Sequence, residues 1–374
     1  MYDTDIIVVG AGIAGASAAH ELSDNFKVLI LEMETHAGYH TSGRSAAIYT
    51  KIYSSEACNK LANLSLGFLQ SPPDEFCDFP LLKERGILHV ARSDQIELLK
   101  EEKRKIESAG DSAEKVEGND LFKLVPALES GNVTAGLYDS NTWDIDVNEL
   151  HGGFLRSVKK KGGILLTETK VLDLKPLENG WLVKTNQGEY SCQTLVNAAG
   201  AWSDELAALA GCRKLGLIPK KRNAFLFNSS PEVYETEEWP FTVDISEQFY
   251  FKPDSGKLLA SPADESPAIP HDARPDDLGI AMGVERLEGA TSLKIRHISH
   301  KWAGLRSFFP DSVPVVGFDP NVEHFFWLAG QGGIGMLTSP AMAACCASLI
   351  REGELPGRMI EAGLSKEDLS PCRF

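Results

Sequence analysis

Three glycines and one acid near the start of the chain have the types and the spacing to hold the phosphates and a ribose of a dinucleotide. The segment reads Gly10-x-Gly12-x-x-Gly15, and Glu32 follows Gly12 by 20 residues. In such a motif the first glycine makes a tight turn, the second lets backbone approach a pyrophosphate, and the third lets a helix pack closely on a strand. The free N–H groups that begin the helix face the phosphates. We therefore expect a dinucleotide site, with the acid on a ribose hydroxyl.

Two arginines are candidates for binding a carboxylate, because a planar guanidinium can donate two parallel hydrogen bonds to it. Arg306 lies within the mainly apolar segment 302–309, which favours a buried charge with a purpose. Arg222 directly follows Lys220 and Lys221, and on spacing alone this favours a solvated basic turn. The residues by themselves therefore support Arg306 more strongly than Arg222.

The cysteines do not form a motif with chemistry of its own. The chain has seven of them, without a Cys-x-x-Cys pair or a Cys/His cluster of zinc spacing. We therefore expect no metal site and mostly buried thiols, and an odd number of cysteines in a long chain favours a reducing compartment. No segment has the motif of a serine, cysteine or metal hydrolase.

The elements that position these residues follow from the hydrophobic pattern. Apolar strands are predicted at Ile6–Val9 and Lys27–Leu31, with a helix over 16–22 between them. A strand, a glycine turn, a helix and a strand within about 30 residues predict a βαβ unit in a parallel sheet covered on both faces. Further helices are predicted over 93–108, 146–158 and 336–350, and strands over 163–166, 170–174, 180–185, 189–192, 194–200 and 325–329, with antiparallel, turn-rich structure over 217–300.

Composition and charge argue against some partners. The chain has 374 residues, and 37 Lys and Arg against 53 Asp and Glu give a formal net charge of −16. This balance argues against a nucleic-acid partner, because neutralising phosphates needs dense Lys and Arg. We see no uncharged apolar stretch of about 18 residues and no basic region at the start, so neither a transmembrane helix nor a signal peptide is expected. The length suggests two domains.

Several further motifs, spread from residue 6 to about 345, resemble a known family. They are Gly43-Arg44-Ser45-Ala46 after the second strand, Val196-Asn-Ala-Ala-Gly-Ala-Trp202, Arg306 followed by Asp311, Pro314 and Gly317, and Gly330-x-Gly-Gly-x-Gly335 before the last long helix. With the glycine turn, they resemble the D-amino-acid oxidase family of flavoenzymes, which includes glycine- and sarcosine-oxidase-like proteins. The resemblance covers nearly the whole chain.

The resemblance implies an α/β fold with a Rossmann-like FAD-binding domain and a second, mostly antiparallel-sheet substrate domain. We expect the first to take residues 1–80, 145–216 and 302–374, and the second to take 81–144 and 217–301. The implied cofactor is FAD, bound without a covalent link. The residues implied to contact it are Gly10, Gly12, Ile13, Ala14, Gly15, Glu32, Met33, Arg44, Ser45, Ala46, Ala47, Val171, Ala199, Gly200, Trp202, Gly330, Gly332, Gly333, Ile334 and Gly335.

The resemblance also implies a substrate site for an amino acid. It gives Arg222 and Arg306 the role of carboxylate clamp, with Tyr53 and Tyr250 as hydroxyl partners of the carboxylate and the Gly333 carbonyl as acceptor from the amine. The implied reaction is oxidative deamination of a D-amino acid, in which a hydride leaves Cα for flavin N5. The imino acid is then hydrolysed to a keto acid and ammonia.

Within the family, the motifs are most similar to those of the bacterial D-arginine dehydrogenases, and two departures bear on specificity. Ile48 stands where those enzymes have a histidine in the flavin-side loop, and Ile87 aligns with their pocket glutamate. A buried cationic side chain without a carboxylate partner costs several kcal/mol. We therefore expect this enzyme to prefer neutral or apolar D-amino acids to D-arginine.

Alternatives follow from the same motifs. A glycine/sarcosine-type amine or 2-hydroxy-acid flavoenzyme would keep the carboxylate clamp and use another donor, and a non-catalytic or tRNA-modifying flavoprotein would keep only FAD binding. The sequence does not distinguish a quinone from oxygen as the electron acceptor. We expect a cytoplasmic protein that can associate peripherally with the inner membrane face.

Overall fold

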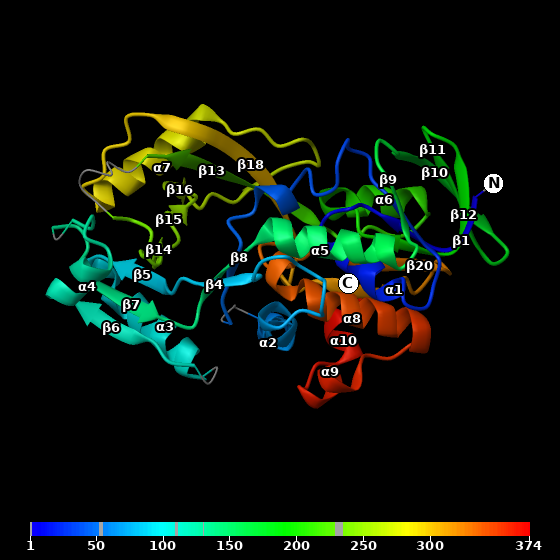
Figure 1. Ribbon diagram of the computed structural model, residues 1–374, viewed down its shortest axis with the longest axis horizontal. Coiled ribbons are helices and arrows are strands. Elements are labelled where there is room, and N and C mark those ends of the chain that lie inside the picture. Colours follow the sequence, from blue (N-terminus) through cyan, green and yellow to red (C-terminus); the bar gives the residue numbers. More distant parts are fainter. Residues whose placement is uncertain (1, 52–54, 109–110, 130, 229–234) are drawn as a thin grey trace.

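Two large sheets lie at opposite ends of the long axis of the protein, with strands β4 (Leu82–Glu84) and β8 (Trp143–Ile145) between them (Figure 1). The structure is a computed structural model that describes residues 2–51, 55–108, 111–129, 131–228 and 235–374. One sheet is built around parallel strands and the other is almost wholly antiparallel. The predicted α/β fold class is confirmed.

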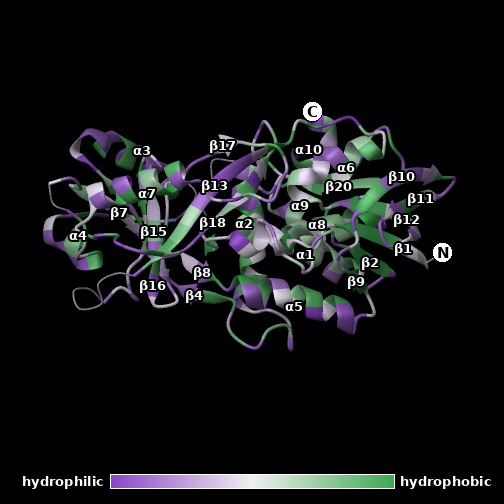
Figure 2. Ribbon diagram, turned by 90° about the horizontal axis from the view of Figure 1, so that it is seen from above, coloured by the Kyte–Doolittle hydropathy of each residue, from purple (hydrophilic) through white to green (hydrophobic). Residues whose placement is uncertain are grey.

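The parallel part of the first sheet has the strand order β20-β12-β1-β2-β9. Its members are β1 (Tyr2–Val9), β2 (Val28–Leu31), β9 (Ile164–Leu166), β12 (Glu189–Asn197) and β20 (Phe325–Ala329). The runs of apolar residues in β2 and β20 are buried on both faces and appear hydrophobic in Figure 2. Helix α1 (Ile13–Leu22) joins β1 to β2, so the predicted βαβ unit is confirmed and the helix begins earlier than expected.

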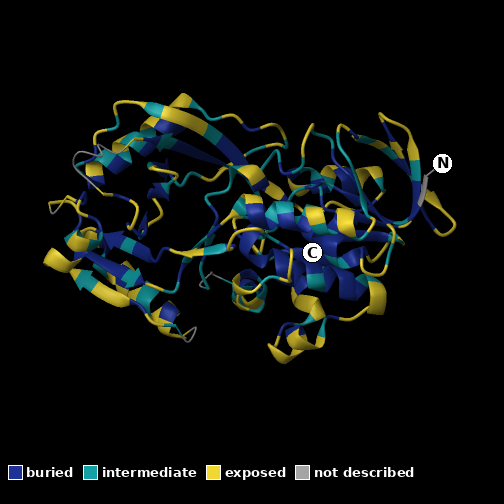
Figure 3. Ribbon diagram, in the orientation of Figure 1, coloured by how far each residue is buried: buried dark blue, intermediate teal, exposed yellow. Residues whose placement is uncertain are grey.

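Helices cover one face of this sheet and a strand meander covers the other. The helices on the first face are α1, α2 (Glu56–Gln70), α5 (Val147–Lys160), α8 (Gly335–Glu352), α9 (Gly357–Glu361) and α10 (Lys366–Leu369). On the other face lie α6 (Ser203–Leu209) and the hairpin of β10 (Val171–Leu177) and β11 (Gly180–Thr185), which continues the sheet from the first part of β12. Strand β19 (Val315–Phe318) pairs antiparallel with β20 within the sheet, with Val315 in one core and Val316 in the other. The central strands between these layers are dark blue, and therefore buried, in Figure 3.

Strand β12 corrects one sequence prediction. Two strands were expected, over 189–192 and 194–200, but one strand runs from Glu189 to Asn197. Its first part pairs antiparallel with β11, and its last three residues pair parallel with β20. The break expected in the pattern is instead a change of partner along one continuous strand.

The second sheet has the order β17-β13-β16-β15-β14-β5-β7-β6, with β18 beside β13, and only the β5–β14 pair is parallel. Its strands are β5 (Ile87–Ala91), β6 (Glu114–Glu117), β7 (Ala135–Asp139), β13 (Ile218–Phe227), β14 (Phe241–Asp244), β15 (Tyr250–Asp254), β16 (Lys257–Ser261), β17 (Ser266–Pro267) and β18 (Ile298–Phe308). The helices α4 (Gly118–Leu124) and α7 (Asp277–Ala290) pack on its outer face, and α3 (Ile96–Ser108) packs beside β5 and β7. The inner face is turned toward the first sheet.

Strand β13 corrects a second prediction, that Lys220, Lys221 and Arg222 form a solvated basic turn. All three lie within β13 and pair with β18, and Arg222 is buried. Alternation along the strand explains the difference, because every second side chain of a strand points to the same face. Strand β18 also runs through residue 302, where a domain boundary was expected, and the division into domains stays a prediction.

The segment 38–50 is mostly a loop, with a short 3₁₀ turn at Ser42–Arg44 and strand β3 at Ile48–Tyr49. Strand β3 pairs with β8, and β8 pairs with β4, so this small sheet lies between the two large ones. Over the described ranges, no helix has both the length and the apolar character to cross a membrane.

Candidate active site

The glycine turn after β1 admits only glycine at its first and third positions. Gly10 has φ +104°, and a Cβ there would lie 2.4 Å from the carbonyl oxygen of Ala198. A Cβ on Gly15 would lie 1.9 Å from the carbonyl oxygen of Gly10, so α1 passes directly beneath the turn. Gly12 caps α1, and the nearest atom to a Cβ there would be Ser42 Oγ at 3.1 Å. The turn thus presents bare backbone at the helix start, as phosphate binding requires.

Glu32 holds the same turn from the end of β2. Its side chain is buried, Oε2 accepts a hydrogen bond from the backbone N–H of Ala11 at 2.8 Å, and Oε1 accepts from the N–H of Glu34 at 3.0 Å. A carboxylate has about four acceptor positions, so these bonds leave capacity for a ligand hydroxyl. Ser42 Oγ accepts from the N–H of Ile13 at 2.8 Å and so takes one of the free donors of α1.

Two connected cavities run along this turn. The first is lined by the predicted cofactor residues Gly10, Gly12, Glu32, Met33, Val171, Ala199, Gly200 and Trp202. The second is lined by Gly12, Ile13, Ala14, Arg44, Ser45, Ala46, Gly200, Gly330, Gly332, Gly333 and Gly335. Gly12, Ser42 and Gly200 belong to the walls of both. Ala47 and Ile334 line a third, adjoining cavity, whereas Gly15 packs beneath the turn.

The loop before α8 closes the second cavity with a fixed backbone. Gly330 has φ +79° and Gly332 has φ +52°, and a Cβ on either would lie 2.3 Å from a phenylalanine ring, that of Phe309 or Phe308 respectively. The N–H of Gly332 donates to the carbonyl oxygen of Ser307 at 2.9 Å. The loop is therefore tied to the end of β18, and the start of α8 faces the cavity.

Arg44 joins the walls of the second cavity. Its guanidinium donates to Asp272 Oδ1 at 2.6 Å and to the carbonyl oxygens of Tyr39, Ala273 and Ala303 at 3.2, 2.8 and 2.9 Å. These partners come from the loop 38–50, from the segment before α7 and from β18. The side chain thus lines the second cavity and connects the first sheet's loop to the second sheet.

The predicted carboxylate clamp comes together on the inner face of the second sheet. Arg222 on β13, Tyr250 on β15 and Arg306 on β18 line the second and third cavities together with Gly333. The Arg222 Cζ lies 5.9 Å from the centre of the Tyr250 ring, and a Cβ on Gly333 would lie 3.3 Å from Arg306 Nη1. Arg222 Nη2 also donates to Glu265 Oε1 at 2.7 Å. Four of the five predicted substrate residues are therefore neighbours.

The fifth, Tyr53, lies outside the described residues. In the described part of the chain, three buried polar atoms in the second cavity's wall residues have no hydrogen-bond partner: Arg222 Nε, Ser307 Oγ and Gln331 Nε2. Buried polar groups are nearly always bonded in folded proteins. Three such groups in one cavity wall therefore indicate the position of a ligand with hydrogen-bond acceptors.

The third cavity extends from the clamp along the inner face of the second sheet. Ile48, Ile87, Phe241 and Val243 give it an apolar wall. His89 lines it two residues beyond Ile87 on β5, and burial, reinforced by Lys105 and opposed by Glu102, lowers the pKa of its imidazole. His89 is therefore neutral at neutral pH.

Sequence reasoning missed Glu265, Gln331 and His89. Gln331 lies between two glycines of the Gly330-x-Gly motif, so its position in the motif was a signal that could have identified it. Glu265 lies 43 residues beyond its partner Arg222, and no local pattern connects the two. Only the pairing of strands brings them together.

Comparison with known proteins identifies the family. The sequence profile described as FAD dependent oxidoreductase (DAO) matches residues 5–349. The chain belongs to this family. FAD is accordingly the cofactor, and the glycine turn, the acceptor capacity of Glu32 and the unpaired Ser307 Oγ and Gln331 Nε2 of the second cavity fit such a ligand.

Proteins similar in sequence include mitochondrial dimethylglycine dehydrogenase of Mus musculus, which is 24% identical over 96% of this chain and 43% of its own length. The chain thus spans less than half of that relative. Among solved structures, L-proline dehydrogenase from P. horikoshii has a TM-score of 0.85 at 24% identity, with 100% of this chain and 98% of that one covered. Glycine oxidase from Geobacillus kaustophilus has a TM-score of 0.82 at 21% identity over 94% and 95%. These likenesses show the fold, and the resemblance to D-arginine dehydrogenases stays a prediction.

Proposed function

We propose that this FAD dependent oxidoreductase oxidises amino acids at the Cα–N bond, and that it favours D-amino acids with neutral or apolar side chains. The observation that carries the proposal is the pair of guanidinium groups, Arg222 and Arg306, on neighbouring strands beside the loop before α8. Two planar guanidinium groups that face this cavity are suited to bind a substrate with a carboxylate next to the reacting carbon.

Each residue of the clamp has a distinct part. Arg306 and the unpaired Nε–H of Arg222 would bind the α-carboxylate, and the Tyr250 hydroxyl would donate to it from the next strand. The Gly333 carbonyl would accept a hydrogen bond from the substrate amine and so fix the position of Cα. FAD, when bound, supplies the two-electron acceptor that takes the Cα hydride. Water then hydrolyses the imino acid to a keto acid and ammonia.

The third cavity supports the preference for uncharged side chains. Ile48 and Ile87 lie in its wall with Phe241 and Val243, so a substrate side chain directed there would contact apolar groups. A cationic side chain against this wall would lose hydration, at a cost of several kcal/mol, unless it reached one of the carboxylates that line other parts of the cavity, those of Glu102, Asp244, Glu247 and Glu265.

The relatives favour a second candidate, an N-methylated glycine. The protein from Mus musculus is named for dimethylglycine, and a clamp for an α-carboxylate would serve such a substrate equally well. The two candidates differ in the size of the group at Cα. A free amino acid with an extended side chain would use the apolar wall, whereas an N-methylglycine would leave it unfilled.

Anaerobic reduction of the bound flavin tests the proposal. A panel of D- and L-amino acids, sarcosine, dimethylglycine and 2-hydroxy acids would be mixed with the holoenzyme while the flavin absorbance is followed. We expect D-methionine, D-leucine and D-phenylalanine to reduce it fastest. Faster reduction by D-arginine or by an L-isomer would refute the proposed specificity, and faster reduction by dimethylglycine would favour the second candidate.

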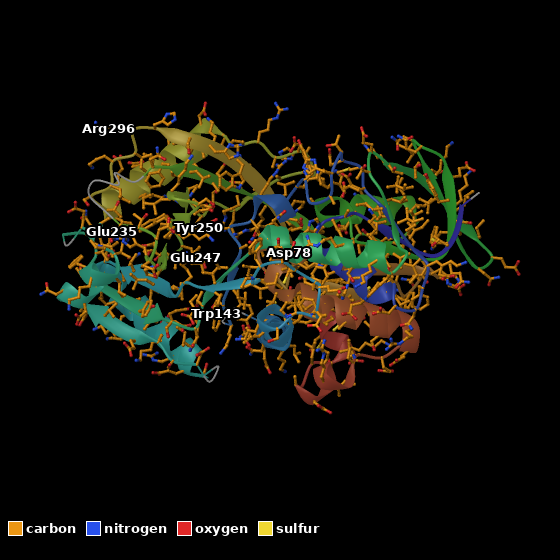
Figure 4. The ribbon with its side chains drawn as sticks, in the orientation of Figure 1. Asp78, Trp143, Glu235, Glu247, Tyr250 and Arg296 are labelled. Carbon is orange, nitrogen blue, oxygen red and sulfur yellow. The ribbon has the colours of Figure 1, made fainter. Side chains whose placement is uncertain are left out.

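A matched pair of variants tests the clamp. Arg306→Met should raise KM steeply, whereas Arg296→Met changes an exposed arginine at the far end of the molecule and should leave KM unchanged (Figure 4). Oxygen uptake with and without a quinone analogue would show whether oxygen or a quinone is the better electron acceptor.

A further inference from the structure

Arg222, one half of the clamp, already binds a carboxylate of its own chain. Glu265 lies in the loop between β16 and β17; its Oε1 accepts from Arg222 Nη2 at 2.7 Å and its Oε2 accepts from Lys220 Nζ at 3.1 Å. Both cations are on β13, and Glu265 lines the third cavity with them. One carboxylate thus bridges two neighbouring cations at the substrate side of the site.

The two strands gather the cations at one place. Lys220 lies directly opposite Arg306 in the β13–β18 pairing, and Arg222 lies two residues further along on the same face. Side chains at opposite and diagonal positions of paired strands are close enough to interact. The patch that these cations form is therefore larger than one α-carboxylate needs.

Glu265 is ionised in this setting. Burial opposes ionisation, but the hydrogen bond from Lys220 and the charges of Arg222, Lys220 and Arg306 outweigh it, so the pKa of Glu265 is lowered. Its side chain keeps 37% of its surface exposed, whereas the Arg222 side chain keeps 8%. The guanidinium is thus fixed in the wall, and the carboxylate approaches it from the open side of the cavity.

We propose that Glu265 fills a second carboxylate-binding position, formed by Arg222 and Lys220, and thereby restricts the site to substrates with one carboxylate. This inference rests on the proposed function, because it takes Arg306 and the Nε edge of Arg222 as the position of the α-carboxylate. A second carboxylate on the substrate meets cations that are already paired and a like charge beside them. Glu265 is thus a specificity-determining residue.

Glu265→Gln tests the inference, because the amide keeps the size of the side chain and removes its charge. The holoenzyme would be titrated with malonate and with acetate, and the shift of the flavin absorbance gives both dissociation constants. We expect the preference for malonate over acetate to rise by about tenfold or more, since a like charge is removed and two cations are released. Glu117→Gln, which breaks an exposed 2.6 Å pair with Lys115 on strand β6, serves as control.

A second variant distinguishes this inference from the case in which Glu265→Gln also displaces Arg222 and so weakens carboxylate binding in general. In the double variant Lys220→Met/Glu265→Gln, the gain for malonate should be smaller than in Glu265→Gln while acetate binding is kept, because only Arg222 then remains to bind the second carboxylate. A parallel weakening of malonate and acetate binding in Glu265→Gln, or an unchanged ratio, would overturn the inference and leave Glu265 as a structural partner of Arg222.

Measurements of flavin reduction by substrates distinguish a failure of this inference from a failure of the proposed function. In Glu265→Gln, flavin reduction by D-glutamate should increase relative to D-methionine by about the same factor as the binding ratio. If no amino acid reduces the wild-type flavin, the proposed function fails, and the malonate titration still decides the role of Glu265.

Discussion

Glu32→Gln should weaken FAD binding by roughly ten- to a hundredfold. In the native protein both carboxylate oxygens of Glu32 accept backbone hydrogen bonds, from Ala11 at 2.8 Å and from Glu34 at 3.0 Å. A glutamine can accept only one of them, and its NH2 group would then face a second N–H. The variant therefore loses one of the two backbone hydrogen bonds that Glu32 accepts, and the bound cofactor loses a charged acceptor.

The magnitude follows from these two bonds. A hydrogen bond to a charged group contributes about 1.5–3 kcal/mol, and each 1.4 kcal/mol is about tenfold in a dissociation constant. Because Glu32 is 7% exposed, water cannot replace the lost partner, so we expect the full cost rather than a fraction of it. The bond to Ala11 acts on the turn itself, and for this reason the cost should be seen in cofactor affinity.

The assay is titration of the apoprotein with FAD, with quenching of flavin fluorescence as the signal, and thermal unfolding of the apoprotein in parallel. Glu117→Gln is the control, since its carboxylate pairs with Lys115 at 2.6 Å on strand β6 of the second sheet, outside both cavities along the turn. An FAD dissociation constant for Glu32→Gln within about twofold of wild type would refute the reasoning, whether or not the apoprotein is destabilised.

Further predictions concern the clamp, its specificity and the pH dependence of stability. Arg306→Met should raise KM by roughly a hundredfold in steady-state kinetics, because a desolvated bidentate partner is lost. Gly333→Ala should raise KM by about three- to tenfold, because its Cβ would lie 3.3 Å from Arg306 Nη1 and displace the guanidinium. Ile87→Glu should increase kcat/KM for D-arginine relative to D-methionine, and an unchanged ratio would show that β5 does not contact the substrate. Burial, with a smaller contribution from Lys161 and opposition from Asp24, lowers the pKa of His20 to about 4. As the pH falls, the unfolded chain therefore binds a proton at His20 before the folded chain does. The free energy of unfolding should fall by up to about 2–3 kcal/mol between about pH 6.5 and pH 4. Thermal unfolding at each pH would measure this loss, which should be smaller in His20→Gln.

Local pattern was sufficient to predict the parallel sheet and its turn. The run of apolar residues before Gly10, the three glycine positions and Glu32 each reflect a requirement that acts within about 30 residues of sequence. The structure confirms the βαβ unit that follows from them. For β12, the local pattern was insufficient. The strand keeps one extended conformation throughout, but its neighbour is β11 in its first part and β20 in its last part, and the change of neighbour leaves no break in the strand.

The arrangement of the predicted substrate residues depends on pairing between strands that are far apart in the sequence, and the spacing of residues along the chain does not reveal this pairing. Lys220, Lys221 and Arg222 read as a solvated turn, and only the pairing with β18 buries Arg222. Glu265 could not be assigned from sequence for the same reason. The placement of Arg222 beside Arg306 was predicted by resemblance to a family and not by the residues themselves, and their roles stay predictions.

Strand β18 connects the proposed substrate clamp directly to the glycine loop before α8. Its residues carry the Trp302 indole that donates to the Arg44 carbonyl, the Arg306 guanidinium and, at Ser307, the carbonyl that accepts from Gly332. A strand is stiff along its axis, so a displacement of Arg306 when a carboxylate binds is transmitted to the glycine loop one residue away. We therefore predict that an inert carboxylate bound at the proposed clamp changes the absorbance of the bound flavin before any bond is broken.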